Sequence, residues 1–435
     1  MNVEQINRAL MEGDIDSRGV LPHIETLSLV PFQFEVDFGL KDLPTQPGVL
    51  LIRGARQYGK STWLEQQIAG TIREFGPGSA LYLNGDILPS KELLVSQIRL
   101  VTQFFHPDAK VKRLFIDEIT AVNDWEKALK YLIDAGELRD VLVVTTGSKA
   151  ADLRRGSERL PGRKGRLDRT NYVFTSISYT EFKKQCGDKL GNQTLSSYLL
   201  SGGSPIAACE LAQTGRLPEY VIELVSDWIL GEFTASGRTR SSLLSVVKTL
   251  LQFGGTPIGQ SKLARESGLA NNTVAQGYVA LLQDLLVLCP AYPINGNNGK
   301  PLWRQPCKYH FVNTLAAMCW HPESIRTPQE LESSPKLHGQ MLEWAVAQEL
   351  FRRRCLKGLE PVPEDIAFWQ SKTHEIDFVA SYPDEWIEVK RGAEDPFHFQ
   401  WFLTTHPTGR LTLINATRFE TKRIQGITLE DFLLF

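Results

Sequence analysis

The residues best suited to chemistry form the run from Gly54 to Ser61, which fits the pattern G-x-x-x-x-G-K-[ST] at every constrained position. Residues 49–52 before it are apolar and predict a buried strand, and residues 62–68 after it predict a helix. In this context the glycines let backbone N–H groups turn toward an anion, and the helix N-terminus adds partial positive charge. The run therefore predicts a triphosphate-binding P-loop.

Within this loop Lys60 is expected to reach the β- and γ-phosphates, and the Ser61 hydroxyl is expected to ligate Mg²⁺. The predicted cofactors are ATP and Mg²⁺. The full set of predicted nucleotide-binding residues is Gly54, Ala55, Arg56, Gln57, Tyr58, Gly59, Lys60, Ser61 and Thr62.

Two acids follow a second apolar run at residues 113–116. A buried strand would deliver Asp117 and Glu118 to the carboxyl edge of a parallel sheet, where ligands bind. Asp117 is predicted to hold Mg²⁺ through water, and Glu118 to act as general base on the attacking water. A third apolar run, residues 141–146, leads to Ser148, whose hydroxyl could orient that water or serve only as a turn residue.

A basic segment follows at residues 149–169. We select Arg163 as a candidate arginine finger, acting in cis or across a subunit boundary. A solvated basic loop is the alternative. The basic residues of the segment are Lys149, Arg154, Arg155, Arg159, Arg163, Lys164, Arg166 and Arg169.

Bulk properties limit the class of protein. A chain of 435 residues is too long for one core. Its net charge of −2 gives no overall sign of nucleic-acid affinity, so any such binding must come from local patches. The six cysteines form no C-x-x-C pair, the first 17 residues do not resemble a secretory signal, and no run approaches the roughly 20 apolar residues of a membrane span. We expect a cytoplasmic protein without membrane contact.

These motifs together resemble a widespread bacterial and archaeal family of AAA+-like P-loop ATPases. The resemblance rests on the P-loop, on residues 116–119 with Trp125 beyond them, and on three later motifs at residues 146–148, 160–163 and 198–203. Members of that family join the ATPase to a winged helix and a C-terminal restriction-endonuclease-like domain. The resemblance implies an α/β fold with a parallel sheet and a helical lid. The ATPase class also suggests a homo-oligomer.

The middle of the chain predicts helix-turn-helix spacing. Apolar residues at helical spacing occur at 243–253, a second short helix at 260–267 ends before Gly268, and a third follows Asn271 with Val274 on its apolar face. Two strands within 286–293 and 302–311 would form a wing. The side chains expected to face outward are Asn272, Thr273, Gln276 and Gln283, with the basic residues Lys300, Arg304 and Lys308 in or near the wing. Contact with DNA and packing against protein both stay open.

The last hundred residues carry a second set of acids. Glu343 lies on the apolar side of a predicted helix at 337–354, and Asp377 precedes Glu388-x-Lys390 on the next predicted strand. This arrangement resembles the PD-(D/E)xK nuclease site, in which Asp377 and Glu388 would hold Mg²⁺ and Lys390 would position the attacking water. An amphipathic hairpin with a solvated face is the alternative.

We therefore predict five parts: an N-terminal segment at 1–40, a P-loop ATPase core at 41–185, a helical lid at 186–240, a winged helix at 241–328 and a restriction-endonuclease-like domain at 329–435. The predicted function is a Mg²⁺-dependent ATPase that couples nucleotide binding and hydrolysis to DNA binding or remodelling. An ATP-regulated DNA nuclease and a signal-transducing NTPase with a protein client are the alternatives.

Overall fold

The structure is a computed structural model that describes residues 1–148, 160–358 and 366–434. The chain forms two compact units. The first comprises Met1–Gln33 and Asp37–Thr175, and the second comprises Phe34–Val36 and Ser176–Phe435. Among the described residues, the search for a helix with the length and hydropathy of a membrane span finds none.

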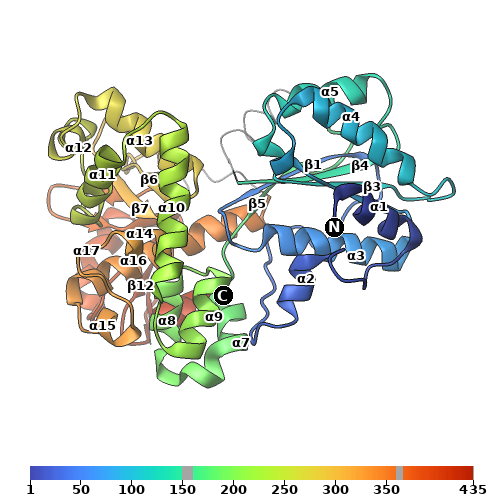
Figure 1. Cartoon of the computed structure of the whole chain (residues 1–435). Coiled ribbons are helices and arrows are strands. Elements are labelled where there is room, and N and C mark those ends of the chain that lie inside the picture. Colours follow the sequence, from blue (N-terminus) through green and yellow to red (C-terminus); the bar gives the residue numbers. More distant parts are fainter. Residues whose placement is uncertain (149–159, 359–365, 435) are drawn as a thin grey trace. The chain divides into compact units, whose positions relative to one another are not determined.

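The first unit is built on a five-stranded sheet in the order β2-β3-β4-β1-β5, with parallel pairing throughout. Helices α4 and α5 cover one face of the sheet and α3 the other (Figure 1). The strands are β1 (Gly48–Gly54), β2 (Ala80–Asn84), β3 (Arg113–Asp117), β4 (Leu142–Gly147) and β5 (Asn171–Phe174). The helices are α1 (Val3–Glu12), α2 (Pro22–Leu27), α3 (Lys60–Phe75), α4 (Lys91–Val101) and α5 (Trp125–Asp134).

One hydrophobic core cluster of this unit lies between the sheet and the helices α4 and α5. Alternate residues of the strands point to this face because side chains alternate along a strand. β3 and β4 are buried along their whole length, as expected for inner strands of a parallel sheet covered on both faces. Core members include Val49, Leu51, Leu81, Leu114, Ile116, Val143, Leu94, Ile98, Trp125 and Leu129.

The N-terminal helix α1 lies against the edge strand β2. The side-chain amide of Asn7, fully buried, donates to the carbonyl of Tyr82 at 2.7 Å and accepts from its N–H at 2.7 Å. These bonds satisfy the Tyr82 N–H and carbonyl groups at the edge of β2, which could otherwise pair with a further strand. The helix therefore closes the edge of the sheet at β2.

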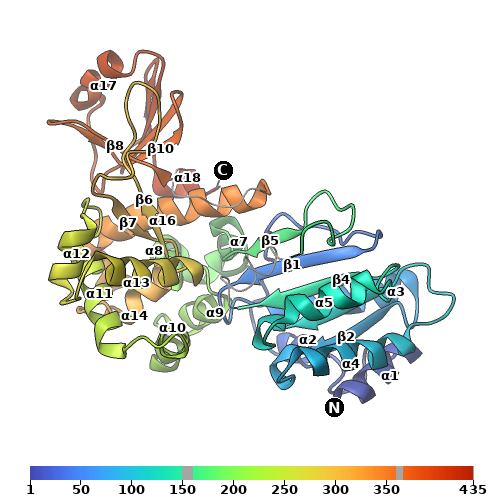
Figure 2. The ribbon, with the colours of Figure 1, turned by 90° about the horizontal axis from the view of Figure 1, so that it is seen from above.

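The second unit begins with helices and continues into a small two-stranded sheet (Figure 2). β6 (Leu288–Ala291) pairs antiparallel with β7 (Lys308–Phe311). The helices up to this sheet are α7 (Tyr179–Leu190), α8 (Thr194–Ser201), α9 (Pro205–Thr214), α10 (Glu219–Ala235), α11 (Arg240–Gln252), α12 (Gln260–Glu266) and α13 (Asn272–Asp284). After it come α14 (Thr314–Cys319), α15 (Pro328–Glu332) and α16 (Pro335–Leu356).

The C-terminal part of this unit contains a five-stranded mixed sheet in the order β10-β11-β12-β14-β13. β11 pairs parallel with β12, and β12 parallel with β14, while both end pairs are antiparallel. Its strands are β10 (Phe378–Ser381), β11 (Glu385–Val389), β12 (Arg410–Ile414), β13 (Phe419–Glu420) and β14 (Ile424–Ile427). A separate antiparallel pair is formed by β8 (Trp369–Gln370) and β9 (Glu375–Ile376), and the helices of this part are α17 (Gln400–Thr405) and α18 (Leu429–Leu434).

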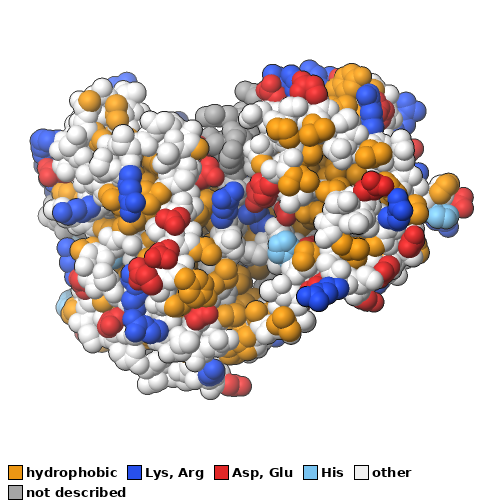
Figure 3. All heavy atoms as spheres, in the orientation of Figure 1, with side chains coloured by type: hydrophobic (Ala, Val, Ile, Leu, Met, Phe, Trp, Pro, Cys, Tyr) orange, Lys and Arg blue, Asp and Glu red, His pale blue; other side chains and the backbone are white. Residues whose placement is uncertain are grey.

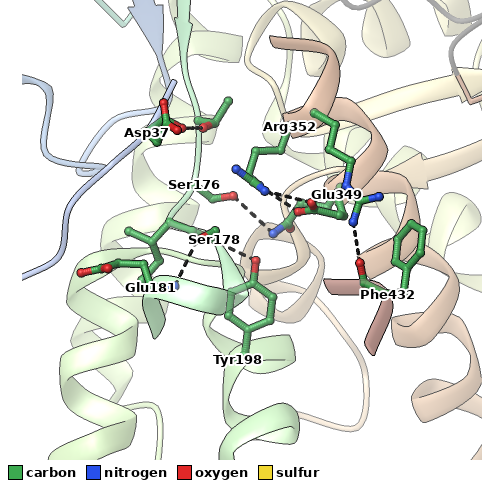
Figure 4. Close-up of polar contacts among 12 residues, drawn as sticks. Asp37, Ser176, Ser178, Glu181, Tyr198, Glu349, Arg352 and Phe432 are labelled. Atoms are coloured by element: carbon green, nitrogen blue, oxygen red, sulfur yellow. Dashed lines mark hydrogen bonds and ion pairs between the residues drawn. The ribbon is translucent and has the colours of Figure 1, made fainter. Parts of the chain in front are cut away.

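Helix α16 is anchored near its C-terminal end by a buried acid. Glu349, 2% exposed, accepts from Arg352 at 2.8 and 2.9 Å and from Arg353 at 2.7 Å (Figure 4). Arg353 also donates to the carbonyl of Phe432 in α18. Arg352 and Arg353 belong to α16 themselves, so Glu349 holds Arg353 in place, and the Arg353 bond to Phe432 joins this end of the helix to α18. The anchor thereby positions the helix that carries Glu343.

Candidate functional site

The P-loop joins β1 to α3, in the strand–loop–helix order that the sequence predicts. Gln57 and Gly59 have left-handed backbone conformations, with φ of 63° and 98°. A left-handed residue turns consecutive N–H groups to one side of the chain, and α3 presents its first N–H groups at the same place. The loop thus has the backbone geometry of an anion cradle, which fits a triphosphate.

Lys60 is the first residue of α3 and is only 4% exposed. Its Nζ donates to the carbonyls of Gly54 at 3.1 Å and Ala55 at 2.9 Å, and it lies 3.9 Å from Oε1 of Glu118. Burial lowers the pKa of Lys60, while the charges of Glu118 and Asp117 oppose that shift. The predicted phosphate-binding lysine and the predicted general base therefore lie close together.

The ends of β3 and β4 position the two predicted acids, because these strands are adjacent in the sheet. The Thr146 hydroxyl donates to Oδ1 of Asp117 and accepts from the N–H of Glu118 at 3.1 Å. Ser148 donates to Oε2 of Glu118 from both its hydroxyl and its N–H, each at 2.9 Å. Glu118 has φ of 46°, an uncommon conformation for a residue other than glycine. Its carboxylate is therefore oriented by a neighbouring strand.

Ser61 and Asp117 are the residues predicted to hold Mg²⁺ in this unit. Ser61 directly follows Lys60 in α3, and Asp117 ends β3 and is 5% exposed. Hydroxyl and carboxylate oxygens are the ligands that Mg²⁺ prefers, usually together with substrate phosphates and water. The donor set fits that ion.

Arg163 forms an ion pair with Asp134 at the end of α5. Its Nε and one terminal nitrogen lie 2.7 and 3.1 Å from the two carboxylate oxygens, and a third nitrogen donates to the carbonyl of Pro161. A finger role would require this pair to open, and that role stays a prediction. Four other basic residues of the predicted segment, Lys149, Arg154, Arg155 and Arg159, lie outside the described residues.

In the second unit the hairpin of β10 and β11 forms as predicted, with Phe378 opposite Ile387. Asp377 accepts from the N–H of Val389 at 2.9 Å, and its own N–H donates to Glu388 at 3.2 Å. Lys390 lies 2.5 Å from Oε1 of Glu388. Asp377, Glu388 and Lys390 are thus brought together.

Glu343 is linked to this set through Lys308, a residue that the sequence analysis assigned to the wing. Lys308 was expected to add positive charge in or near the wing, but its side chain is fully buried. Its Nζ lies 2.8 Å from Asp377, 2.6 Å from Glu375 and 3.4 Å from Glu343. The expectation for Lys308 is therefore wrong, because these carboxylates compensate a buried ammonium. Glu375 was not predicted to take part.

Charge and burial shift the pKa values of the acids of this cluster in different directions. Burial raises the pKa of Glu343, and burial together with the charge of Asp377 raises that of Glu388. Burial would also raise the pKa of Asp377, but Lys308 holds it below its usual value. Next to them, burial lowers the pKa of His310 to about 3. His310 is therefore a neutral imidazole, 3.8 Å from Glu343.

This cluster contains a cation of its own. Among the residues that the structure describes, no group of three or more His, Cys, Asp or Glu side chains is arranged to hold a metal ion. The Lys308 ammonium lies among the carboxylates that a metal would need. Asp377 is thus paired with a cation of the chain itself, and the predicted Mg²⁺ role of Asp377 and Glu388 stays a prediction.

The helices α11 to α13 and the strands β6 and β7 follow the predicted order. Asn271 caps α13, accepting from the N–H of Val274, and Asn272, Thr273 and Gln276 are exposed. Val274 itself is 38% exposed, so its predicted place on the apolar face is wrong. It lies in the first turn, before the buried positions at Ala275 and Tyr278 begin.

The segment between β6 and β7 presents cationic and aromatic side chains. Lys300 and Arg304 are exposed as predicted. Trp303, which the sequence analysis missed, is 53% exposed and packs edge-to-face on Tyr292 at 4.8 Å. On the face drawn in Figure 3, basic and acidic side chains are interspersed on both units, consistent with the net charge of −2. Any basic site is therefore local.

Comparison with known proteins gives one family match. A family model described as an AAA domain matches residues 46–183. The search of curated proteins finds no match.

Solved structures give remote similarities. The ORC1 protein of Aeropyrum pernix in complex with DNA has a TM-score of 0.32 and 12% identity, covering 71% of this chain and 94% of that chain. Cdc6p from Pyrobaculum aerophilum scores 0.28 with 12% identity, covering 63% and 90%. AMPPCP-bound DnaA from Aquifex aeolicus scores 0.28 with 13% identity, covering 64% and 92%. No functional conclusion rests on scores this low. Residues 46–183 match an AAA domain, and the parallel five-stranded sheet is consistent with the P-loop AAA+ fold.

Proposed function

We propose that this chain is a Mg²⁺-dependent ATPase that couples nucleotide binding and hydrolysis to DNA binding or remodelling. One observation carries the ATPase proposal. Lys60 of the P-loop and Glu118, which follows β3, lie 3.9 Å apart at the carboxyl edge of the sheet. A phosphate-binding cation and a base for water are both needed at one place for phosphoryl transfer to water. The AAA domain match over residues 46–183 supports the same proposal.

The roles follow from the contacts. The loop amides and Lys60 bind the β- and γ-phosphates, and Glu118 accepts a proton from the attacking water while Ser148 fixes its carboxylate. Ser61 and Asp117 would hold Mg²⁺, which neutralises phosphate charge when bound. Ser148 occupies Oε2 of Glu118, and Oε1 lies 3.9 Å from Lys60, so Oε1 is the oxygen that we assign to the attacking water.

Phosphate release by the purified chain tests the ATPase proposal. Glu118→Gln keeps the shape of the side chain but removes the base, so turnover should fall by about 10² to 10⁴-fold while ATP binding persists. Glu92→Gln, a change at an exposed surface acid, is the control. Wild-type turnover in Glu118→Gln would exclude Glu118 as the base.

The DNA part of the proposal rests on the second unit, where a helix-turn-helix with a two-stranded wing is the interpretation we favour. The first turn of α13 carries exposed Asn272 and Thr273, and the wing segment carries Lys300 and Arg304. Polar residues at the start of a second helix read base edges in such modules, and wing cations contact phosphates. Exposed Trp303 adds a flat apolar surface that can stack on a base.

The nuclease alternative has less support. Asp377, Glu388 and Lys390 do lie together, as a PD-(D/E)xK site requires. However, Asp377 pairs with the Lys308 ammonium at 2.8 Å, so a cation is already present in that donor set. A protein client remains the alternative if the second unit binds no DNA at low salt.

A further inference from the structure

The acidic cluster of the second unit contains its own cation. Lys308 comes from β7, whereas its three carboxylate partners come from α16, from β9 and from the residue that follows β9. The Nζ distances are 3.4 Å to Glu343, 2.6 Å to Glu375 and 2.8 Å to Asp377. An ammonium has three N–H donors and no acceptor. Three carboxylates therefore match its donors one for one.

The two acids that resemble nuclease metal ligands have no oxygen left without a donor. In Asp377, Oδ1 accepts from Lys308 and Oδ2 from the N–H of Val389 at 2.9 Å. In Glu388, Oε1 pairs with Lys390 at 2.5 Å and Oε2 accepts from the N–H of Asp377 at 3.2 Å. Each of these oxygens keeps a second lone pair, but a metal ion that binds Asp377 would lie beside the Lys308 ammonium, and the two like charges would repel each other.

Burial makes the arrangement costly to change. The Lys308 side chain is fully buried, and those of Asp377 and Glu388 are 12% and 6% exposed. Removing one partner of a buried charge pair leaves an uncompensated charge, which is strongly destabilising. Glu375 and Lys390 are 36% and 39% exposed, so solvent reaches the rim of the cluster but not Lys308.

We propose that the Lys308 ammonium is the resident cation of this cluster, that the site takes no divalent metal, and that it joins β7 to α16 and the C-terminal sheet. The site is then an internal ionic connection and does not cut DNA. This inference is independent of the ATPase proposal, because it concerns other residues in the other unit.

Manganese binding tests the proposal directly. Mn²⁺ is titrated into the full chain without nucleotide, with free Mn²⁺ measured by electron paramagnetic resonance. The background variant Asp117→Asn removes the metal ligand of the first unit. No stoichiometric site is expected, and adding Glu388→Gln should change nothing. One bound Mn²⁺ per chain that Glu388→Gln abolishes would overturn the proposal.

Thermal unfolding supplies a second test, which uses the isosteric change Lys308→Met. Loss of the ammonium should lower the melting temperature by at least about 5 °C, or prevent folding, because buried acids lose their partner. Lys300→Met, at an exposed lysine of the same segment, is the matched control and should shift it by less than about 2 °C. Equal melting temperatures for Lys308→Met and Lys300→Met would contradict the proposal.

Plasmid nicking completes the test. The wild-type chain is expected to leave supercoiled DNA intact with Mg²⁺ or Mn²⁺. Nicking that requires the metal and disappears in Lys390→Ala would overturn the proposal while leaving the ATPase proposal untouched.

Discussion

Ser148 holds Glu118 through two hydrogen bonds to one carboxylate oxygen, from the hydroxyl and from the backbone N–H, each at 2.9 Å. Ser148 is 3% exposed and follows β4, whereas Glu118 follows β3. The relationship gives the hydroxyl at this strand end a defined partner. Ser148 thus positions the predicted base, and its predicted role toward the attacking water itself stays a prediction.

Ser148→Ala should therefore lower ATP turnover. The variant loses the hydroxyl bond but keeps the backbone bond, so we expect kcat to fall about 10-fold with little change in KM. Steady-state phosphate release measures both constants. Ser96→Ala, at an exposed serine of α4, is the control. An unchanged kcat in Ser148→Ala would leave Ser148 without a catalytic contribution.

Gly202→Ala should destabilise the second unit through a close backbone contact. Gly202 has φ of 57°, and a Cβ there would lie 2.6 Å from the backbone nitrogen of Leu315. We expect a loss of about 2 to 4 kcal/mol in urea unfolding.

Gly215→Ala separates the two causes. Gly215 has a similar φ of 75°, but a Cβ there would meet nothing within 4 Å. Only the conformational cost of about 1 kcal/mol is expected. Equal losses in the two variants would show that the contact with Leu315 is unimportant.

His23 should make the stability of the first unit depend on pH. Its hydrogen bond to the buried Glu65, at 2.6 Å, raises the pKa of His23 despite partial burial. A raised folded-state pKa gives stability that is complete below the unfolded pKa, about 6.5, and is lost as pH rises through the folded value. The melting temperature should thus decline with rising pH above 6.5.

His23→Gln should reduce the fall in melting temperature between pH 6 and pH 9 by about 1 to 3 °C. The effect is small because the His23 side chain is 49% exposed and solvent screens its pair with Glu65. Calorimetric melting between pH 6 and pH 9 measures it. His106→Gln, at an exposed histidine, should keep the wild-type slope. A wild-type slope in His23→Gln would contradict the assignment.

DNA binding should depend on the wing cations. The double variant Lys300→Ala and Arg304→Ala should weaken duplex binding at low salt about 3- to 30-fold and reduce the salt slope by about 1 to 2, because up to two phosphate contacts are lost. Fluorescence anisotropy at several salt concentrations measures both effects. Lys422→Ala, at an exposed lysine of the C-terminal sheet region, is the control.

The outcome has three informative forms. Binding that is unaffected by the double variant would place the DNA contact elsewhere on the chain. The absence of binding by the wild type at low salt would exclude the DNA proposal and favour a protein client. A loss limited to the double variant would support the wing as the contact.

The first unit was largely predictable because its signals are local. The P-loop, the apolar run ending in Asp117 and Glu118, and the strand before Ser148 each lie within a few residues, and a parallel sheet places their carboxyl ends at one edge. The N-terminal segment was not predictable. Its docking depends on Asn7 contacting Tyr82, 75 residues away, which no local pattern encodes.

Lys308 shows why part of the second unit was mispredicted. Lys308 and His310 alternate with Tyr309 and Phe311, a pattern typical of a strand with one solvated face. The carboxylates that bury Lys308 lie 35 and 69 residues further along the chain, at Glu343 and Asp377. Because charge pairing over such separations leaves no periodic signal, the sequence alone favoured exposure.

Titration calorimetry of Mg-ATP into the wild-type chain tests the central claim most directly. The account predicts saturable binding at one site per chain, weakened at least about 10-fold in Lys60→Ala, which removes a charge-assisted contact to phosphate. Lys130→Ala, at an exposed lysine of α5, should bind as the wild type does. No saturable heat from the wild type would contradict the account.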